Sequence, residues 1–139
     1  MSASTKLSTV VKALCFMAEE DNAPKTSAEI SIQTGVNASK LRMLLSMLAK
    51  SNIVASGKGI KGGFVLNKDP RDIHLQEIYC SIEDRKAFHL DVQKFSGHHL
   101  SLPVQINNYF LDLFAEIQVN IEDKMTKISL QSIIDNLER

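Results

Sequence analysis

The sequence predicts a mainly α-helical protein with one small β-hairpin. Through most of the chain, apolar residues recur at three- and four-residue spacing, which is the period of an amphipathic helix. One glycine-rich stretch, Ser56 to Phe64, stands between two short β-prone runs, as in a hairpin. With 139 residues, 44% of them hydrophobic, the chain can bury one core, so we expect one domain, or a compact domain with an added helical arm.

Two helices are expected at the start of the chain. The first, from Lys6 to Glu20, has one apolar face. The second is short, from Ser27 to Thr34, because Thr26 and Glu29 have the spacing of a capping box and Gly35 supplies a stop.

A third helix should begin after Asn37, which can cap it. Its apolar strip comprises Leu41, Leu44, Leu45 and Leu48, and its other side carries Ser39, Lys40, Arg42, Met43, Ser46 and Lys50. Two helices joined by a tight turn, the second with a polar and basic outer face, favour a helix-turn-helix.

Charge is divided unevenly along the chain, although the net charge is zero. Residues 1–66 hold eight Lys or Arg against four Asp or Glu, and residues 67–139 hold eight against twelve. No acid lies between Glu29 and Asp69. The pattern is typical of a protein that offers one basic face to a polyanion, and a run of solvated lysines is the alternative.

The stretch SGKGIKGGF could be a phosphate-binding loop or the tip of a hairpin. A phosphate loop needs GxxxxGK[ST] before a helix, whereas here Gly-Gly and a β-prone run follow the second lysine. A hairpin directly after a helix-turn-helix is a wing. We therefore expect its lysines, Lys58 and Lys61, to contact DNA phosphates or reach a minor groove, and its glycines, Gly57, Gly59, Gly62 and Gly63, to form the turn.

Together these segments resemble the Rrf2 family of bacterial winged-helix transcription regulators over about residues 4–135. The matching residues are Gly59, Gly62, Gly63 and Phe64 in the wing and Asp69, Pro70, Ile73 and Leu75 after it. The resemblance implies a homodimer that binds a pseudo-palindromic operator on double-stranded DNA, usually as a repressor. It also implies dimerisation through a long C-terminal helix.

The sequence itself predicts that helix, from Val104 to Met125. Its apolar stripe, which we take as the dimer interface, comprises Ile106, Phe110, Leu113, Ile117 and Ile121. The expected organisation is a winged-helix DNA-binding domain at 1–84, a linker or sensor loop at 85–103 and a helical dimerisation region at 104–139, packed on the first helix.

Many members of the family hold an iron-sulfur cluster through three cysteines in the loop before the long helix. The corresponding loop here, residues 85–103, has no cysteine, so we expect no cluster and no other cofactor. Its histidines, His89, His98 and His99, lack a recognisable metal-ligand spacing, and polar loop residues are the better interpretation.

Two cysteines, Cys15 and Cys80, lie within predicted helices. Buried core positions are the favoured interpretation for both, and redox sensing is the alternative, with Cys15 the better candidate. Whether a redox signal or a small molecule is the effector stays open.

No catalytic motif, signal peptide or membrane span is recognisable, so we expect a cytoplasmic protein that is not an enzyme. The predicted function is sequence-specific DNA binding. The alternative is a winged-helix protein-interaction module that binds an acidic partner.

Overall fold

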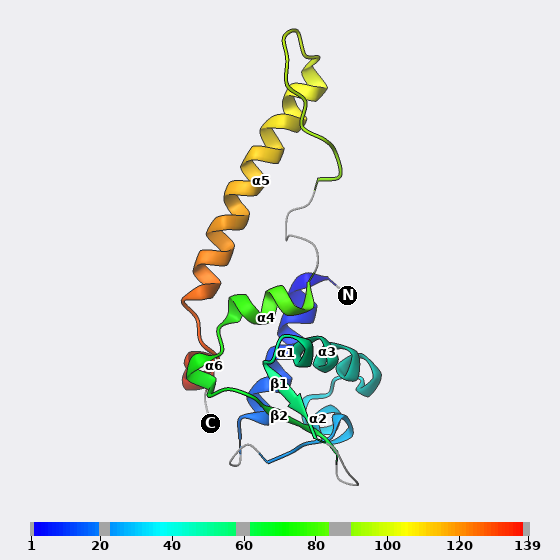
Figure 1. Ribbon diagram of the computed structural model, residues 1–139, viewed down its shortest axis with the longest axis vertical. Coiled ribbons are helices and arrows are strands. Elements are labelled where there is room, and N and C mark those ends of the chain that lie inside the picture. The colour runs from blue at the N-terminus through cyan, green and yellow to red at the C-terminus, as the bar shows by residue number, and fades with distance from the viewer. Residues whose placement is uncertain (1, 20–22, 58–61, 84–89, 138–139) are drawn as a thin grey trace.

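The computed structural model describes residues 2–19, 23–57, 62–83 and 90–137. Its elements in chain order are α1 (Ala3–Met17), α2 (Ser27–Thr34), α3 (Ala38–Lys50), β1 (Val54–Ser56), β2 (Phe64–Leu66), the 3-10 helix η2 (Pro70–Asp72), α4 (Leu75–Ile82), α5 (Leu102–Thr126) and α6 (Leu130–Asp135). A compact head holds all of them except α5, which projects away from it (Figure 1). The expected mainly helical fold with one hairpin and a long C-terminal helix is confirmed.

The core of the head lies between α1, α3, α4 and the hairpin. The four leucines predicted for the inner strip of α3 are all fully buried. They pack with Val10, Ala13, Leu14, Met17, Ile30, Ile53, Val54, Leu66, Ile73, Ile78, Ile82 and Leu130. Each such leucine contributes about 1.5 to 3 kcal/mol through burial, so the apolar strip sets the orientation of α3.

Side-chain caps set where the helices begin. The Ser2 hydroxyl accepts from Thr5 N at 3.2 Å, so α1 starts at Ala3, earlier than the predicted Lys6. The helix also ends earlier than predicted, at Met17. There the ammonium of Lys25 donates to the carbonyl oxygens of Met17 and Glu19 at 3.5 and 3.1 Å, which satisfies groups that the helix end leaves without partners.

The hairpin is antiparallel, with Val54 opposite Leu66 and Ser56 opposite Phe64. On its other side, Phe64 pairs with Lys25 from the segment between α1 and α2. Lys25 N donates to Phe64 O at 3.1 Å, and Phe64 N donates to Lys25 O at 2.8 Å. The base of the wing is therefore held from both sides.

This pairing explains why position 63 is a glycine. A Cβ atom on Gly63 would lie 2.8 Å from both the carbonyl carbon and the carbonyl oxygen of Lys25. Side chains do not tolerate such a distance to backbone atoms, so the close approach of the two segments requires a residue without one.

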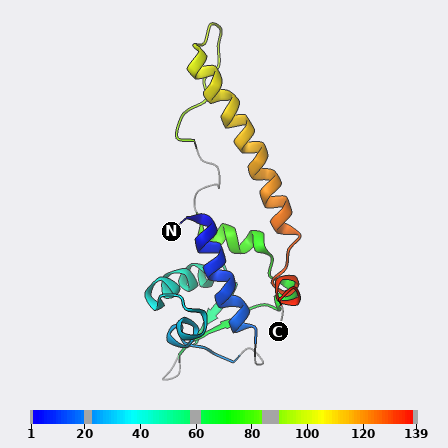
Figure 2. The same cartoon turned by 180° about the vertical axis from the view of Figure 1, so that it is seen from behind.

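The C-terminal helices are attached to the head near the start of α4. Leu75 N donates to Ile128 O at 2.8 Å, and Leu130 N donates to Ile73 O at 2.7 Å. Within region 104–139, α6 packs against α1 and η2, and α5 packs against α4. Figures 1 and 2 agree that the N-terminal part of α5 lies far from the head.

Asp69 shapes the turn after the hairpin. Its carboxylate accepts hydrogen bonds from the guanidinium and backbone of Arg71, and these bonds lower its pKa to about 2.

Among the helices of the described residues, none is long and apolar enough to cross a membrane.

Candidate nucleic-acid interface

The turn between α2 and α3 fixes the relative orientation of the two helices. Gly35 has a φ of 74°, in the left-handed region that glycine adopts readily, and its N–H donates to Ser31 O at 2.8 Å. The Ser31 hydroxyl donates to Val36 O, and the Thr34 hydroxyl to Ile30 O at 2.6 Å. These short-range hydrogen bonds hold the turn in one conformation and so fix the orientation of α3 relative to α2.

The outward face of α3 carries the residues predicted to contact DNA. Ser39, Arg42, Met43, Ser46 and Lys50 are all exposed, and their spacing places them on one side of the helix, opposite the buried leucines. Lys40 is exposed at the flank of this face. Lys50 lies at the far end, about 15 Å along the helix from Lys40 at 1.5 Å per residue.

The N-terminal end of α3 carries a positive partial charge, and the Asn37 side chain occupies two of its amide groups. The Asn37 side chain accepts from Ser39 N and Lys40 N at 2.9 and 3.2 Å, and the first turn has no acid. Positive partial charge of the helix end therefore adds to that of the nearby cations. Among the described residues, the ion pairs are Lys6–Glu83, Lys68–Glu77, Arg71–Asp69 and Lys94–Asp112, and none of them includes a basic side chain of α3.

The base of the wing lies next to the helix-turn-helix, at the end of the molecule opposite the tip of α5 (Figure 1). Gly57, Gly62 and Gly63 belong to the described residues, whereas Lys58, Gly59 and Lys61 lie outside them. The DNA contacts predicted for the two lysines therefore stay predictions.

Lys25 has a structural role that the sequence did not reveal. Only 5% of it is exposed, its ammonium lies 5.4 Å from the centroid of the Phe16 ring, and its backbone pairs with the wing. It stands in a polar segment without periodicity, where a solvated lysine is the ordinary expectation. The partners that bury it come from α1 and β2, which no local pattern identifies.

The two cysteines differ in exposure. Cys15 is half-buried on α1, but Cys80 is exposed, so the expected core position of Cys80 is wrong. The inner face of α4 is formed by Ile78, Tyr79 and Ile82, and Cys80 points elsewhere. Partial burial raises the pKa of the Cys80 thiol, and the negative charge of Glu122 raises it further.

The segment before α5 folds back onto that helix. Asn108 forms two hydrogen bonds with the backbone of Phe95, at 2.8 and 3.1 Å, and Lys94 pairs with Asp112 at 2.6 Å. His98 and His99 are exposed, and His89 lies outside the described residues. Within the ranges that the structure describes, no group of three or more His, Cys, Asp or Glu side chains could hold a metal ion.

The apolar stripe of α5 is uncovered toward its N-terminal end. Ile106 and Phe110 are 45% and 40% exposed, whereas Leu113, Ile117 and Ile121 are half-buried. Aromatic contacts join Phe110 to Tyr109 and Phe114, with ring centroids 5.8 and 5.5 Å apart. A soluble surface rarely leaves so much apolar side chain open unless something binds there.

A tight helix pair, a basic outer helix and a hairpin beside it define a winged helix-turn-helix protein. The chain belongs to the Rrf2 family, described as "Iron-dependent Transcriptional regulator", whose sequence profile matches residues 3–136. It is accordingly a DNA-binding transcriptional regulator of that family and not an enzyme.

Individual relatives agree with this assignment. The chain is 30% identical over 115 residues to YwnA of Bacillus subtilis (strain 168), which carries the name of an HTH-type transcriptional regulator; the match covers 81% of this chain and 84% of YwnA. It is 27% identical to the HTH-type transcriptional regulator IscR of Photorhabdus laumondii, over 83% of this chain and 67% of that protein.

Solved structures share the fold at low sequence identity. The IscR structure from T. potens superimposes with a TM-score of 0.72 at 22% identity, covering 99% of this chain and 89% of that one. CymR, the global cysteine regulator of B. subtilis, gives a TM-score of 0.71 at 17% identity, covering 99% and 97%. At these identities the likeness establishes the architecture alone.

Proposed function

We propose that this protein is a cytoplasmic, homodimeric repressor that binds a pseudo-palindromic operator and carries no iron-sulfur cluster. The observation that supports operator binding most directly is the exposed, acid-free face of α3, whose basic side chains have no ion-pair partner among the described residues. An α-helix of this kind fits the major groove of B-DNA.

In this proposal the N-terminal half of α3 enters the major groove. Ser39 and Met43 face the base edges beside Arg42, whose guanidinium can pair bidentately with guanine. Arg42 Nη2 lies 3.4 Å from the Ser39 hydroxyl, a long contact that a base can replace. Lys40, at the flank, and Lys50, at the far end, contact phosphates and set the register.

Replacing Arg42 by alanine is expected to weaken operator binding by about 1 to 3 kcal/mol and to relax the preference at one base position. Competition titrations against operators changed one base pair at a time would measure this. A Lys50→Ala protein is the matched control, since loss of a phosphate contact weakens binding to every sequence alike. An equal loss of affinity for random DNA would show that Arg42 contacts phosphates and not a base.

Replacing Lys58 and Lys61 together by alanine should flatten the dependence of affinity on salt. Each phosphate contact contributes about 0.9 to the slope of log K against log salt, so the slope should fall by nearly 2. Titrations over a series of salt concentrations on specific and random DNA provide the measurement. An unchanged slope would remove the wing lysines from the interface.

The homodimer is supported by α5. Its 25 residues extend over about 38 Å, and its apolar side chains are exposed toward its N-terminal end, far from the head (Figure 1). A second copy of the chain, related by a two-fold axis, would cover this stripe and place two reading helices on two half-sites.

Absence of a cluster is supported by the available ligands. Iron-sulfur clusters are held by thiolates, and the sequence contains two cysteines, on α1 and α4, with none in the segment before α5. These residues do not fit a cluster held by three cysteines of that segment. Protein purified without oxygen should contain neither iron nor acid-labile sulfide.

The proposed function is tested by footprinting on DNA upstream of the protein's own gene, with and without an oxidant or a thiol reductant. We expect a protected, pseudo-palindromic site at moderate salt. Its absence would favour the interaction module for an acidic partner. Protection lost on oxidation would point to redox sensing by Cys15 or Cys80.

A further inference from the structure

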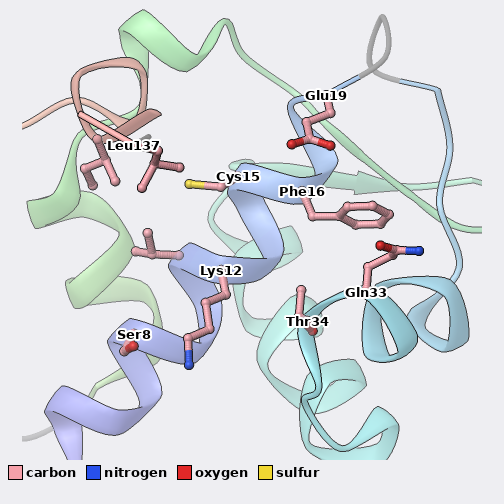
Figure 3. A pocket seen from close by; sticks show the side chains of 10 residues that line it. Ser8, Lys12, Cys15, Phe16, Glu19, Gln33, Thr34 and Leu137 are labelled. Atoms are coloured by element: carbon pink, nitrogen blue, oxygen red, sulfur yellow. The ribbon is translucent and has the colours of Figure 1, made fainter. Parts of the chain in front are cut away.

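A groove runs along the outer side of α1 between α6 and the end of α2 (Figure 3). Its volume is about 510 Å³, within the range of small-molecule sites. The floor is α1, one wall carries Ile133 and Leu137, and the opposite wall carries Gln33 and Thr34. It lies apart from the outward face of α3, so the proposed DNA contacts do not account for it.

The lining combines an apolar middle with charged ends. Cys15 points toward Leu137 of α6, and Phe16 points toward Gln33 on the opposite wall, while Lys12 and Glu19 lie toward opposite ends (Figure 3). Lys12 lies on α1, and Glu19 follows the end of that helix at Met17. Neither side chain takes part in an ion pair in the part of the chain that the structure describes.

We propose that this groove binds a small organic molecule with an apolar body and a single anionic group. The anion meets Lys12, where the Ser8 hydroxyl supplies a second donor at the same end. The net positive charge of residues 1–66 favours an anion there, and the Glu19 carboxylate disfavours a second negative charge at the other end. The apolar body lies between α1 and α6.

The groove is connected to both DNA-reading elements, an inference that rests on the proposed function. Phe16 forms part of the lining and also contacts the Lys25 ammonium, and the Lys25 backbone pairs with Phe64 at the base of the wing. Thr34, in the opposite wall, is the last residue of α2 before the turn into α3. An occupant therefore contacts residues that position the wing and the recognition helix, which makes it an effector of DNA affinity.

Cys15 lines the groove and provides a site-specific reporter. In a Cys80→Ser protein it is the sole thiol, because the chain has two cysteines. The probe is 8-anilino-1-naphthalenesulfonate, and N-phenyl-1-naphthylamine is its counterpart without the anion. We expect the anionic probe to slow alkylation of Cys15 by N-ethylmaleimide. Unchanged alkylation at saturating probe would overturn the site, even if the probe binds elsewhere, for example on α5.

Two comparisons test the position of the bound molecule, one between the two probes and one between two tryptophan variants. A Lys12→Gln change should lower the affinity for the anionic probe about two- to fivefold, as expected for the loss of an exposed ion pair. The affinity for the neutral probe should be unchanged. A Gln33→Trp change should fill the groove and abolish protection, whereas Ile32→Trp places the same bulk on the neighbouring residue, which is 79% exposed and outside the lining. Equal effects of the two tryptophans would contradict the proposal.

The connection to DNA is tested separately, on an operator that the protein is first shown to bind. Saturating anionic probe should change operator affinity at least about fivefold in the Cys80→Ser protein and not in its Gln33→Trp derivative. If the protein binds no DNA, the proposed function fails while thiol protection still decides the site. If DNA and probe both bind but affinity is unchanged, the effector role is overturned.

Discussion

A Gly63→Ala protein is expected to lose about 1 to 3 kcal/mol of its free energy of unfolding, the usual cost of overpacking. The added Cβ would lie 2.8 Å from the carbonyl carbon and oxygen of Lys25. Because both are backbone atoms, no rotamer change can relieve the contact, and the wing or the α1–α2 segment must move. Equilibrium denaturation in urea measures the loss.

The same change should weaken operator binding, because it displaces the wing from Lys25. Gly57→Ala is the matched control at the other strand of the hairpin, where the nearest atom to an added Cβ, the carbonyl oxygen of Gly63, lies 3.4 Å away. This is close to ordinary contact, so a much smaller effect is expected. Equal losses from the two substitutions would show that the Lys25 contact does not define the wing.

Replacing Ile106 and Phe110 together by aspartate should convert the dimer into a folded monomer and lower operator affinity by about 100-fold or more. Two unpaired carboxylates would be buried at the proposed interface, which is strongly unfavourable. A monomer binds one half-site and loses the gain in operator affinity that comes from linking two DNA-binding domains. Sedimentation equilibrium and operator titration measure the two effects.

The head should remain intact in this variant, because the two side chains are 45% and 40% exposed in the single chain. A Val119→Asp protein is the matched control, since Val119 is 56% exposed and lies about half a turn around the same helix from Phe110. It should stay dimeric. If the double variant also stays dimeric and binds the operator as the parent does, α5 is not the dimer interface.

Local chemistry explains why the helix-turn-helix could be predicted. Thr26 and Asn37 cap α2 and α3 through bonds to residues two or three positions away, and Gly35 ends α2 in the left-handed conformation. The bounds Ser27–Thr34 and the buried strip of α3 agree with the structure for this reason. Periodicity also placed the outward face of α3, although its contacts with DNA stay a proposal.

Other features depend on partners far away in sequence. Cys80 lies within an apolar helical pattern, yet the packing of α4 turns it outward. Lys25 stands in a polar stretch of the sequence, yet carbonyl groups at the end of α1, the Phe16 ring and β2 together bury it. The groove beside Cys15 exists because α6 returns to pack on α1 more than a hundred residues along the chain.

The sequence by itself determined the helix-turn-helix, the hairpin after it and the long apolar helix, because caps, turns and periodicity act within a few residues. It also determined the family. Only the tertiary structure decided how the wing is held, which thiol is exposed and where a groove forms. Those features arise from contacts such as Lys25 with Phe64 and Ile73 with Leu130, whose partners no local pattern specifies.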